Sequence, residues 1–289
     1  METGKLKTKI IILAILGLLF MNFYLWQFIF NLDNNLKVVF FDIGQGDSAF
    51  IETPQGHQVL IDGGPSGKKL LEKLSNYIPF WDKTLDLIVL THPDYDHLAG
   101  LVYVLDRYDV KNILWTGAKK DTQTFNKWEE RIKKEKAEII IANAGQKIKT
   151  GMAEFFILYP FKNLEQEFFE KGSNESSIVL KLSFGKNSFL FTGDIVKKVK
   201  QELLEKEVNI SSQVLKVAHH GSKTSNSQEF LESVYPEIAV ISCSKNNSYG
   251  HPHKVVLRNL EEFGINTLRT DEKGDIKITS DGSNLNFKF

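Results

Sequence analysis

Residues 91–97, Thr-His-Pro-Asp-Tyr-Asp-His, hold two imidazoles and two carboxylates directly after the apolar run 87–90. Such polar and ionisable groups are costly to bury at the end of a strand unless a cation compensates them. Imidazole and carboxylate are ligands of divalent metal ions, and a pair of such ions is the usual compensation. The segment therefore predicts a metal centre at this strand end.

Three further segments place similar groups after short β-like runs or glycine turns. Asp194 follows one apolar run, His219 and His220 follow another, and residues 249–253 carry two more histidines. Six of the seven histidines lie in these clusters. Capping of helix starts is the alternative interpretation of an isolated polar loop. Because the histidines gather in this way, the pattern favours metal binding over capping.

The length and the charge balance of the chain limit the class of protein to which it can belong. A chain of 289 residues can bury one sizeable core, and one large α/β domain fits that length better than two small ones. Lys plus Arg equals Asp plus Glu at 36 each, so bulk charge does not hold this protein to nucleic acid and any such contact is local. The single cysteine, Cys243, excludes an intramolecular disulfide.

The N-terminal segment is typical of a membrane span. No charged residue occurs between Lys9 and Asp33, and the interval is rich in Ile, Leu and Phe. Lys5 and Lys7 precede it, so the positive-inside tendency places the N-terminus in the cytoplasm and the rest outside. A cleaved secretion signal is the alternative, but a small-x-small cleavage site is missing. We expect an uncleaved, single-pass anchor in the cell membrane.

The chain thus divides into a cytoplasmic N-terminus with its anchor, residues 1–33, and an extracytoplasmic domain, residues 34–289. Hydrophobic periodicity in the second part predicts two successive β-rich halves, each flanked by helices. This order favours a four-layer αββα sandwich over a doubly wound parallel sheet. The predicted strands include 36–41, 49–52, 58–61, 85–90 and 113–115 in the first half. The second half starts at 138–142 and closes with 267–269 and 275–279.

Several motifs in a fixed order resemble a known superfamily. Residues 62–64 (Asp-Gly-Gly), the 92–97 motif, Gly193-Asp194 and residues 219–222 (His-His-Gly-Ser) are similar to the metallo-β-lactamase superfamily. More narrowly, residues 42–48, 91–94, 215–222 and 249–252 resemble the hydrolase domain of the ComEC family of competence DNA-uptake channels. The resemblance covers the chain from about Leu36 onwards. It implies the αββα fold and a metal-dependent hydrolase whose substrate is DNA, single-stranded or duplex.

Matching the motifs residue by residue implies a set of metal ligands. His92 and Asp94 are expected on one ion and Asp96 and His97 on the other, with Asp194 as the bridge. One histidine of the 219–220 pair completes the set.

We expect that histidine to be His220 and expect His219 to face the substrate. Asp94 and Asn174 stand where histidines are usual in the superfamily. Carboxylate and amide oxygens harden the site, which favours Mn²⁺ over Zn²⁺.

Two cations that share a carboxylate make hydroxide available near neutral pH and hold a phosphate oxygen, so phosphodiester hydrolysis is the expected reaction. Asp96 is expected to orient the attacking water, and His251 to stabilise a phosphoryl oxygen or protonate the leaving group. Ser222 and Asn174 are candidate donors to phosphate oxygens. Asp62 is expected to support a ligand histidine from behind. Asp42 and Asp47 are expected to be turn or supporting residues.

Two other functions remain open from the sequence. One is hydrolysis of a different ester or amide, such as a phosphorylcholine ester or a β-lactam, although Asp94 and Asn174 disfavour the zinc site of a β-lactamase. The other is a non-catalytic DNA-binding partner of a separate uptake channel. Only one membrane span is visible here, so we expect any DNA translocation to require a separate channel protein. The intact ligand set argues against a decayed site.

Overall fold

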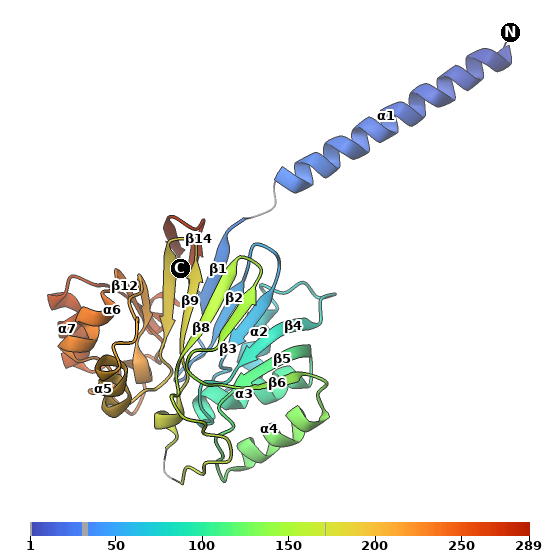
Figure 1. The fold of residues 1–289 in the computed structure, drawn as a ribbon. Helices are drawn as coiled ribbons and strands as arrows, with labels where there is room; N and C mark the ends of the chain where they lie inside the picture. Colours follow the sequence, from blue (N-terminus) through green and yellow to red (C-terminus); the bar gives the residue numbers. More distant parts are fainter. Residues whose placement is uncertain (1, 31–33, 171) are drawn as a thin grey trace. The chain divides into compact units, whose positions relative to one another are not determined.

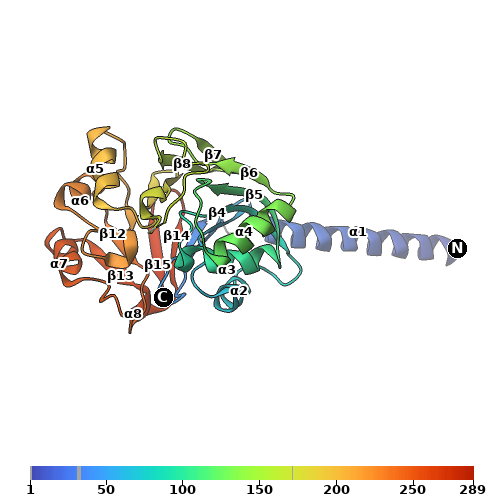
Figure 2. The ribbon, with the colours of Figure 1, turned by 90° about the horizontal axis from the view of Figure 1, so that it is seen from below.

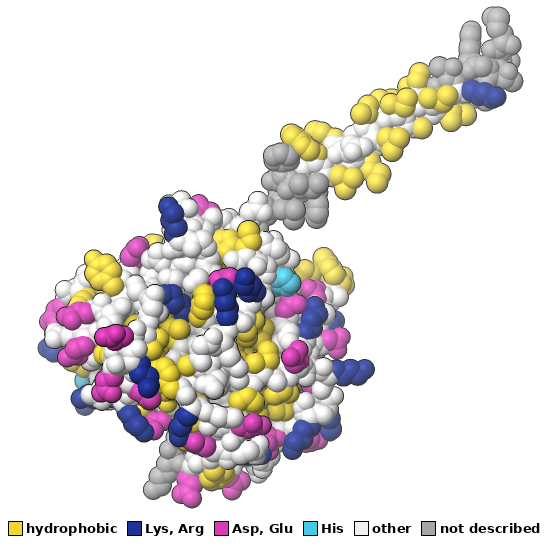
Figure 3. Space-filling view, viewed as in Figure 1, with side chains coloured by type: hydrophobic (Ala, Val, Ile, Leu, Met, Phe, Trp, Pro, Cys, Tyr) yellow, Lys and Arg dark blue, Asp and Glu magenta, His cyan; other side chains and the backbone are white. Residues whose placement is uncertain are grey.

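The computed structural model describes residues 2–30, 34–170 and 172–289, and the chain forms two compact units, Met1–Asn34 and Asn35–Phe289. The boundary expected at residue 33 lies outside the described residues. The first unit is helix α1 (Glu2–Phe30), whose described side chains are almost all hydrophobic (Figure 3). Its stretch Lys9–Trp26 is long and apolar enough to cross a membrane. A cleaved secretion signal can have the same length and composition, so the expectation that this segment remains uncleaved stays a prediction.

The second unit is built on two β-sheets, shown in Figure 1. The eight-stranded sheet has the order β15-β14-β1-β2-β3-β4-β5-β6. Its strands are β1 (Leu36–Phe40), β2 (Ala49–Glu52), β3 (Gln58–Ile61), β4 (Thr84–Val89), β5 (Asp109–Trp115), β6 (Glu138–Ile141), β14 (Ile276–Ser280) and β15 (Leu285–Lys288).

The seven-stranded sheet has the order β13-β12-β11-β10-β9-β8-β7. Its strands are β7 (Lys147–Thr150), β8 (Ala153–Tyr159), β9 (Val179–Phe184), β10 (Asn187–Phe191), β11 (Val214–Lys216), β12 (Ile238–Ile241) and β13 (Asn266–Arg269). Parallel pairing of β10 with β11, and of β11 with β12, brings the carboxyl ends of these strands to one edge.

Three hydrophobic cores separate four layers. The central core joins the facing surfaces of the two sheets, with Phe40 stacked on Phe191 across the interface. A second core packs helices against the first sheet, and a third packs helices against the second sheet (Figures 1 and 2). The helices on the first sheet are α2 (Gly67–Leu74), α3 (Tyr95–Leu105) and α4 (Gln123–Lys134). The helices on the second sheet are α5 (Lys197–Glu205), α6 (Gln228–Val234) and α7 (Lys254–Glu262). The short helix α8 (Thr270–Lys273) follows β13. The predicted αββα sandwich is confirmed.

The division of strands between the sheets differs from the prediction. Residues 138–142 were expected to open the second half, but β6 pairs in parallel with β5 at the edge of the first sheet. The predicted closing strands also separate, because β14 returns to pair with β1 while β13 stays in the second sheet. Strands β7 and β15 were not predicted. Alternation of apolar side chains indicates a strand and its buried face, but it does not name the pairing partner.

Two glycines bring α3 against the turn that follows β3. Gly100 lies in α3, and a Cβ there would come within 1.9 Å of the carbonyl oxygen of Gly63. The backbone N–H of Gly63 in turn donates to the carbonyl of His97 at 2.7 Å. This close approach holds the helix that begins inside the 91–97 motif against the residues that follow Asp62.

We expect Gly100→Ala to destabilise the protein by about 1–3 kcal/mol through overpacking. The sign of this change is informative, because replacing glycine by alanine in an unobstructed helix raises stability by up to about 1 kcal/mol. Urea unfolding followed by circular dichroism measures the change. Equal or higher stability of Gly100→Ala would show that the contact with Gly63 does not constrain α3.

Candidate metal centre

The predicted metal clusters meet at one edge of the two sheets. Residues 91–97 follow β4, Asp194 follows β10, and the 3₁₀ turn Ala218–Gly221 follows β11. Asp62 follows β3, whose neighbour is β4. Because these strands end at the same edge, loops that are far apart in the sequence place their side chains around one space.

The carboxylate of Asp194 lies among four imidazoles. Its Oδ1 is 3.4 Å from Nε2 of His97, and its Oδ2 is 3.6 Å from Nε2 of His220. The same Oδ2 is 3.9 Å from Nε2 of His219 and 4.0 Å from Nε2 of His92. These separations exceed ordinary hydrogen-bond lengths, so the atoms surround a common space instead of bonding to one another.

Four groups of three side chains have ligand atoms within 4.8 Å of one another, and two of the groups consist of predicted metal ligands alone. His92, His97 and Asp194 form the first of these two groups, and Asp96, His97 and His220 form the second. The sequence interpretation divided His92 and His97 between two ions, whereas the structure places His97 in both groups. His220 is buried in the second group with its Nε2 3.2 Å from Oδ2 of Asp96.

Each of the three buried histidines is held through its Nδ1 atom. Nδ1 of His97 lies 2.8 Å from Oδ2 of Asp62, and Nδ1 of His92 lies 3.0 Å from the hydroxyl of Thr91, which donates to the same carboxylate at 2.7 Å. Nδ1 of His220 lies 3.0 Å from a main-chain carbonyl. A proton on Nδ1 leaves Nε2 as the free lone pair, which is the arrangement of a metal-binding histidine. The structure thus places Asp62 behind His97, where the sequence predicted its supporting role.

Several buried polar atoms in this space lack a hydrogen-bond partner among the described residues. They are Nε2 of His92, Nε2 of His97 and Oδ1 of Asp194. Buried polar atoms are nearly always paired, and unpaired buried charge is expensive. Divalent cations would satisfy all three atoms, so the residues present fit the metal ions that the sequence predicts.

The carboxylates of the centre are ionised at neutral pH. Burial alone raises the pKa of Asp96, but His220 and His97 bring it down to about 2. Burial also acts to raise the pKa of Asp194, and His220 and His97 hold it well below its usual range. Burial lowers the pKa of His97, whereas the carboxylates of Asp194 and Asp62 raise it well above its usual range. The carboxylates thus attract positive charge to this space, which a proton on His97 supplies without metal and a divalent cation would supply in its place.

A buried ion pair behind His220 was not predicted. Nζ of Lys216 lies 2.7 Å from Oδ2 of Asp47, and both side chains are almost fully buried. Oδ1 of Asp47 is 3.2 Å from Nδ1 of His220. Burial acts to raise the pKa of Asp47, and Lys216 together with His220 lowers it far below its usual range. Asp47 is therefore more than a turn residue, because its charge supports His220. Its position directly after Gly46 in the 42–48 motif was the available signal.

Asp94 is placed differently from the other predicted ligands. Its Oδ1 accepts hydrogen bonds from the Lys120 ammonium and the Ser173 hydroxyl, which leaves Oδ2, 3.8 Å from Nε2 of His92, to face the centre. The positive charge of Lys120 therefore compensates the Asp94 carboxylate.

His219 is one-third exposed and lies at the mouth of the centre. Its Nδ1 is 3.2 Å from the amide nitrogen of Asn174, so this amide orients His219 instead of facing a phosphate directly. Ser222, predicted as a phosphate donor, is engaged in its own loop, with its hydroxyl 3.2 Å from that of Ser225. That placement gives Ser222 a structural role in the loop.

His251 stands beside His219, with 5.6 Å between the ring centroids. Burial, followed by the charges of His219 and His220, lowers the pKa of His251 to about 4. A neutral imidazole donates an N–H readily but is a weak source of protons. Of the two predicted roles, this favours stabilisation of an oxygen. Asn247, which the sequence did not single out, holds the loop by accepting from the His251 N–H at 2.9 Å and donating to its carbonyl at 2.5 Å.

The backbone is unusual at three of these side chains. Asp62, His219 and His220 have φ values of 56°, 48° and 52°, in the left-handed region that non-glycine residues seldom adopt. Each such residue costs of the order of 1–3 kcal/mol, and such outliers gather at functional sites. The conformation aims both histidines from one short turn into the centre.

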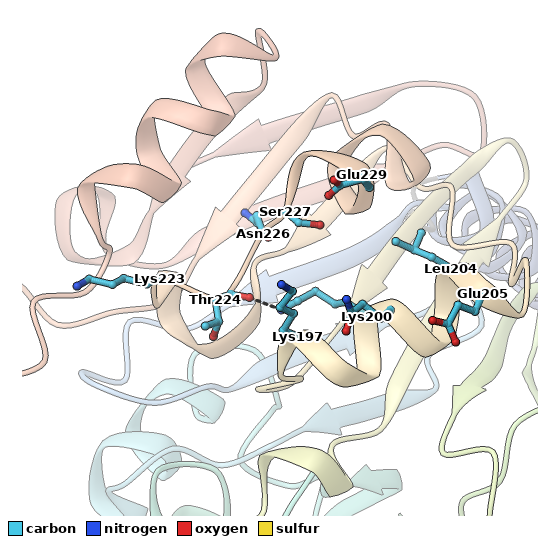
Figure 4. A pocket seen from close by; sticks show the side chains of 10 residues that line it. Lys197, Lys200, Leu204, Glu205, Lys223, Thr224, Asn226, Ser227 and Glu229 are labelled. Carbon is cyan, nitrogen blue, oxygen red and sulfur yellow. Dashed lines mark hydrogen bonds between the residues drawn. The ribbon is translucent and has the colours of Figure 1, made fainter.

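A hollow of about 560 Å³ lies beside this turn, between α5 and residues 223–229 (Figure 4). Lys200 in its wall is buried and donates to the carbonyls of Ile195 at 3.0 Å and Thr224 at 2.5 Å. Burial lowers the pKa of Lys200 to about 7. The lysine thus ties the residue after Asp194 to the loop after His220, which fixes two of the loops that carry the centre.

Comparison with known proteins accounts for this arrangement. Residues 41–155 match the family described as the metallo-beta-lactamase superfamily, and the match includes the 91–97 motif. The folded unit thus resembles the metallo-β-lactamase superfamily and has its αββα fold. This metallo-β-lactamase-like unit, called the metallo-β-lactamase domain below, therefore has a hydrolase-like fold and a candidate site for divalent metal ions.

Relatives of this domain occur among competence proteins. The chain is 34% identical over 261 residues to ComE operon protein 3 of Bacillus subtilis, which aligns 83% of this chain with 32% of the relative. It is 30% identical over 254 residues to Competence protein ComA of Neisseria gonorrhoeae, with 85% of this chain and 32% of the relative covered. The chain thus spans about a third of the length of these relatives and resembles the ComEC family.

Solved structures support the fold of the metallo-β-lactamase domain. The metallo-beta-lactamase fold protein YhfI from Bacillus subtilis matches with a TM-score of 0.56 at 13% identity, covering 86% of this chain and 100% of that one. CmlA, a diiron beta-hydroxylase from Streptomyces venezuelae, matches with a TM-score of 0.53 at 13% identity, covering 84% and 54%. At these identities the likeness concerns the fold alone.

Proposed function

We propose that the metallo-β-lactamase domain is a metal-dependent phosphodiesterase that cleaves DNA outside the cell membrane, to which α1 anchors it. The observation that carries this proposal is the convergence of His92, His97 and Asp194 with unpaired, buried ligand atoms. Similarity to competence proteins supports DNA as the substrate and a separate uptake channel as the partner.

The proposed ligands are His92, Asp94, Asp96, His97, Asp194 and His220. Asp94 contributes one oxygen next to His92, since its other oxygen accepts from Lys120 and Ser173. A set with three carboxylates suits Mn²⁺, and its imidazoles also suit Zn²⁺. When bound, divalent cations would supply hydroxide near neutral pH and neutralise charge on a phosphate.

The chain's own side chains at the mouth of the centre would position the substrate. Asp96 is one-third exposed and ionised, so it can accept a hydrogen bond from an incoming water and orient it. The Asn174 amide donates to Nδ1 of His219, which leaves the Nε2–H of His219 to donate to a phosphate oxygen. Neutral His251 can donate to a second oxygen.

The test is cleavage of end-labelled DNA by the full chain in detergent, with Mn²⁺ or Zn²⁺ added after chelation. We expect Mn²⁺-dependent cleavage that Asp96→Ala abolishes, together with no hydrolysis of nitrocefin. Hydrolysis of nitrocefin or of a phosphorylcholine ester, with DNA left intact, would replace the proposal with one of those activities. Binding of DNA without cleavage under every metal tested would indicate a non-catalytic partner of a channel.

A further inference from the structure

Helix α3 leads away from the metal motif and carries two exposed tyrosines. Tyr95 lies between Asp94 and Asp96 and is 60% exposed, and Tyr103 is 55% exposed. At a rise of 1.5 Å per residue the two positions are about 12 Å apart along the helix. One end of this pair is therefore covalently adjacent to the candidate metal centre.

Both tyrosines line one groove of about 590 Å³. The groove runs along α3, which lies between α2 and α4 in Figures 1 and 2. Gly67 opens α2 at this wall, and a Cβ there would come within 2.2 Å of the Tyr103 ring. The missing side chain lets the ring lie against the helix start, with much of its surface open to the groove.

Three basic and two acidic side chains line the groove. Lys68 and Lys127 are exposed and line opposite walls, and neither makes an ion pair within the part of the chain that the structure describes. The third cation, Arg131, is already paired with Asp106 at 2.5 Å. Glu130, the other acid in the wall, is paired with a lysine of its own helix at 2.5 Å. Two lysines therefore remain to attract an anion.

We propose that this groove binds a single strand of nucleic acid on its way to the metal centre. Unpaired bases stack on Tyr95 and Tyr103, while Lys68 and Lys127 contact the phosphates. Aromatic platforms beside a basic groove are the usual means of binding a single strand without sequence preference. Stacking requires unpaired bases, so the groove selects a single strand over a duplex. At 3.4 Å per stacked nucleotide, the 12 Å between the tyrosines accommodates roughly three or four nucleotides.

The inference rests on the proposed phosphodiesterase function, and its test is kept separate from cleavage. Fluorescence anisotropy of a labelled oligothymidine is measured with the full chain in detergent and excess EDTA, so that no strand is cut. We expect Tyr103→Ala to raise Kd by roughly five- to 150-fold and Tyr103→Phe to leave it near the wild-type value, because the ring is what stacks.

The lysines provide a second, independent readout. For a single strand, each phosphate contact contributes about 0.7 to the slope of log affinity against log salt concentration. Combining Lys68→Ala with Lys127→Ala is expected to reduce the slope by about 1.4. Matched controls are Phe80→Ala, which removes an exposed ring outside the groove, and Lys133→Ala, on α4 but outside the groove. Neither control is expected to change binding.

The proposal is overturned if the wild-type chain does not bind the oligonucleotide, if a duplex of the same length binds as tightly, or if Tyr103→Ala and the lysine pair both bind like wild type. If Tyr103→Ala does not fold, the lysine pair decides the matter, and an unchanged affinity with an unchanged salt slope would overturn the proposal. Binding that depends on Tyr103 in EDTA, combined with no cleavage after metal is restored, would keep the groove and reject the phosphodiesterase.

Discussion

Asp194→Asn is expected to lower the rate of DNA cleavage by on the order of a thousandfold or more and to reduce the amount of bound metal. The carboxylate lies within 4.0 Å of the Nε2 atoms of four histidines, so one change removes the negative charge that faces all four. Stabilisation of charge by metal ions contributes several kcal/mol, and each 1.36 kcal/mol corresponds to a factor of ten in rate. Asparagine has the same shape, so the fold should be retained.

Metal content by mass spectrometry and turnover of a labelled oligonucleotide measure the two effects of Asp194→Asn. Asp121→Asn, at an exposed carboxylate before α4, serves as the matched control. If Asp194→Asn retained both its metal and its activity, Asp194 would not be the bridge and the chemistry would have to be located elsewhere.

Lys216→Met should be the most destabilising of the substitutions considered for this domain, by about 3–5 kcal/mol. Removal of the lysine leaves the charge of Asp47 buried without its partner, which lies 2.7 Å away in the intact protein. For a chain of this size, each kcal/mol lowers the melting temperature by about 2–4 °C. Chemical unfolding gives the free energy directly.

A double substitution distinguishes the effect of breaking the Asp47–Lys216 ion pair from the effect of a general loss of packing. Asp47→Asn combined with Lys216→Met removes both charges, so part of the lost stability should return. Cleavage activity should not return with it, because the Asp47 carboxylate also lies 3.2 Å from Nδ1 of His220. A change in unfolding free energy below about 0.5 kcal/mol for Lys216→Met would contradict the structural importance of the pair.

The left-handed turn at His219 and His220 explains why the loop after β11 needs support from several sides. Lys200 reaches across to the Thr224 carbonyl, and Asp47 lies against His220 from behind. A turn that is unfavourable by itself persists only when its surroundings hold it. Buried charge around the centre thus positions ligands that the local backbone would not present.

Local pattern was enough to locate the chemistry and most of the elements. The 91–97 motif, Asp194 and the 219–220 pair each follow an apolar run, and side chains at strand ends are accessible to a site. Strands β2 and β3 begin and end at the predicted residues, 49–52 and 58–61. The order of the motifs was sufficient to indicate the superfamily and with it the four layers.

Tertiary structure decided the pairings that act over long sequence separations. The partner of β6, the return of β14 to the first sheet and the contacts Asp47–Lys216 and Asp94–Lys120 join segments that no local periodicity connects. A lysine at the end of a strand has the same pattern whether it is solvated or buried against a carboxylate. Only the tertiary structure decides whether such a lysine is solvated or buried, because the cost of burying its charge depends on the partner that the rest of the chain brings to it.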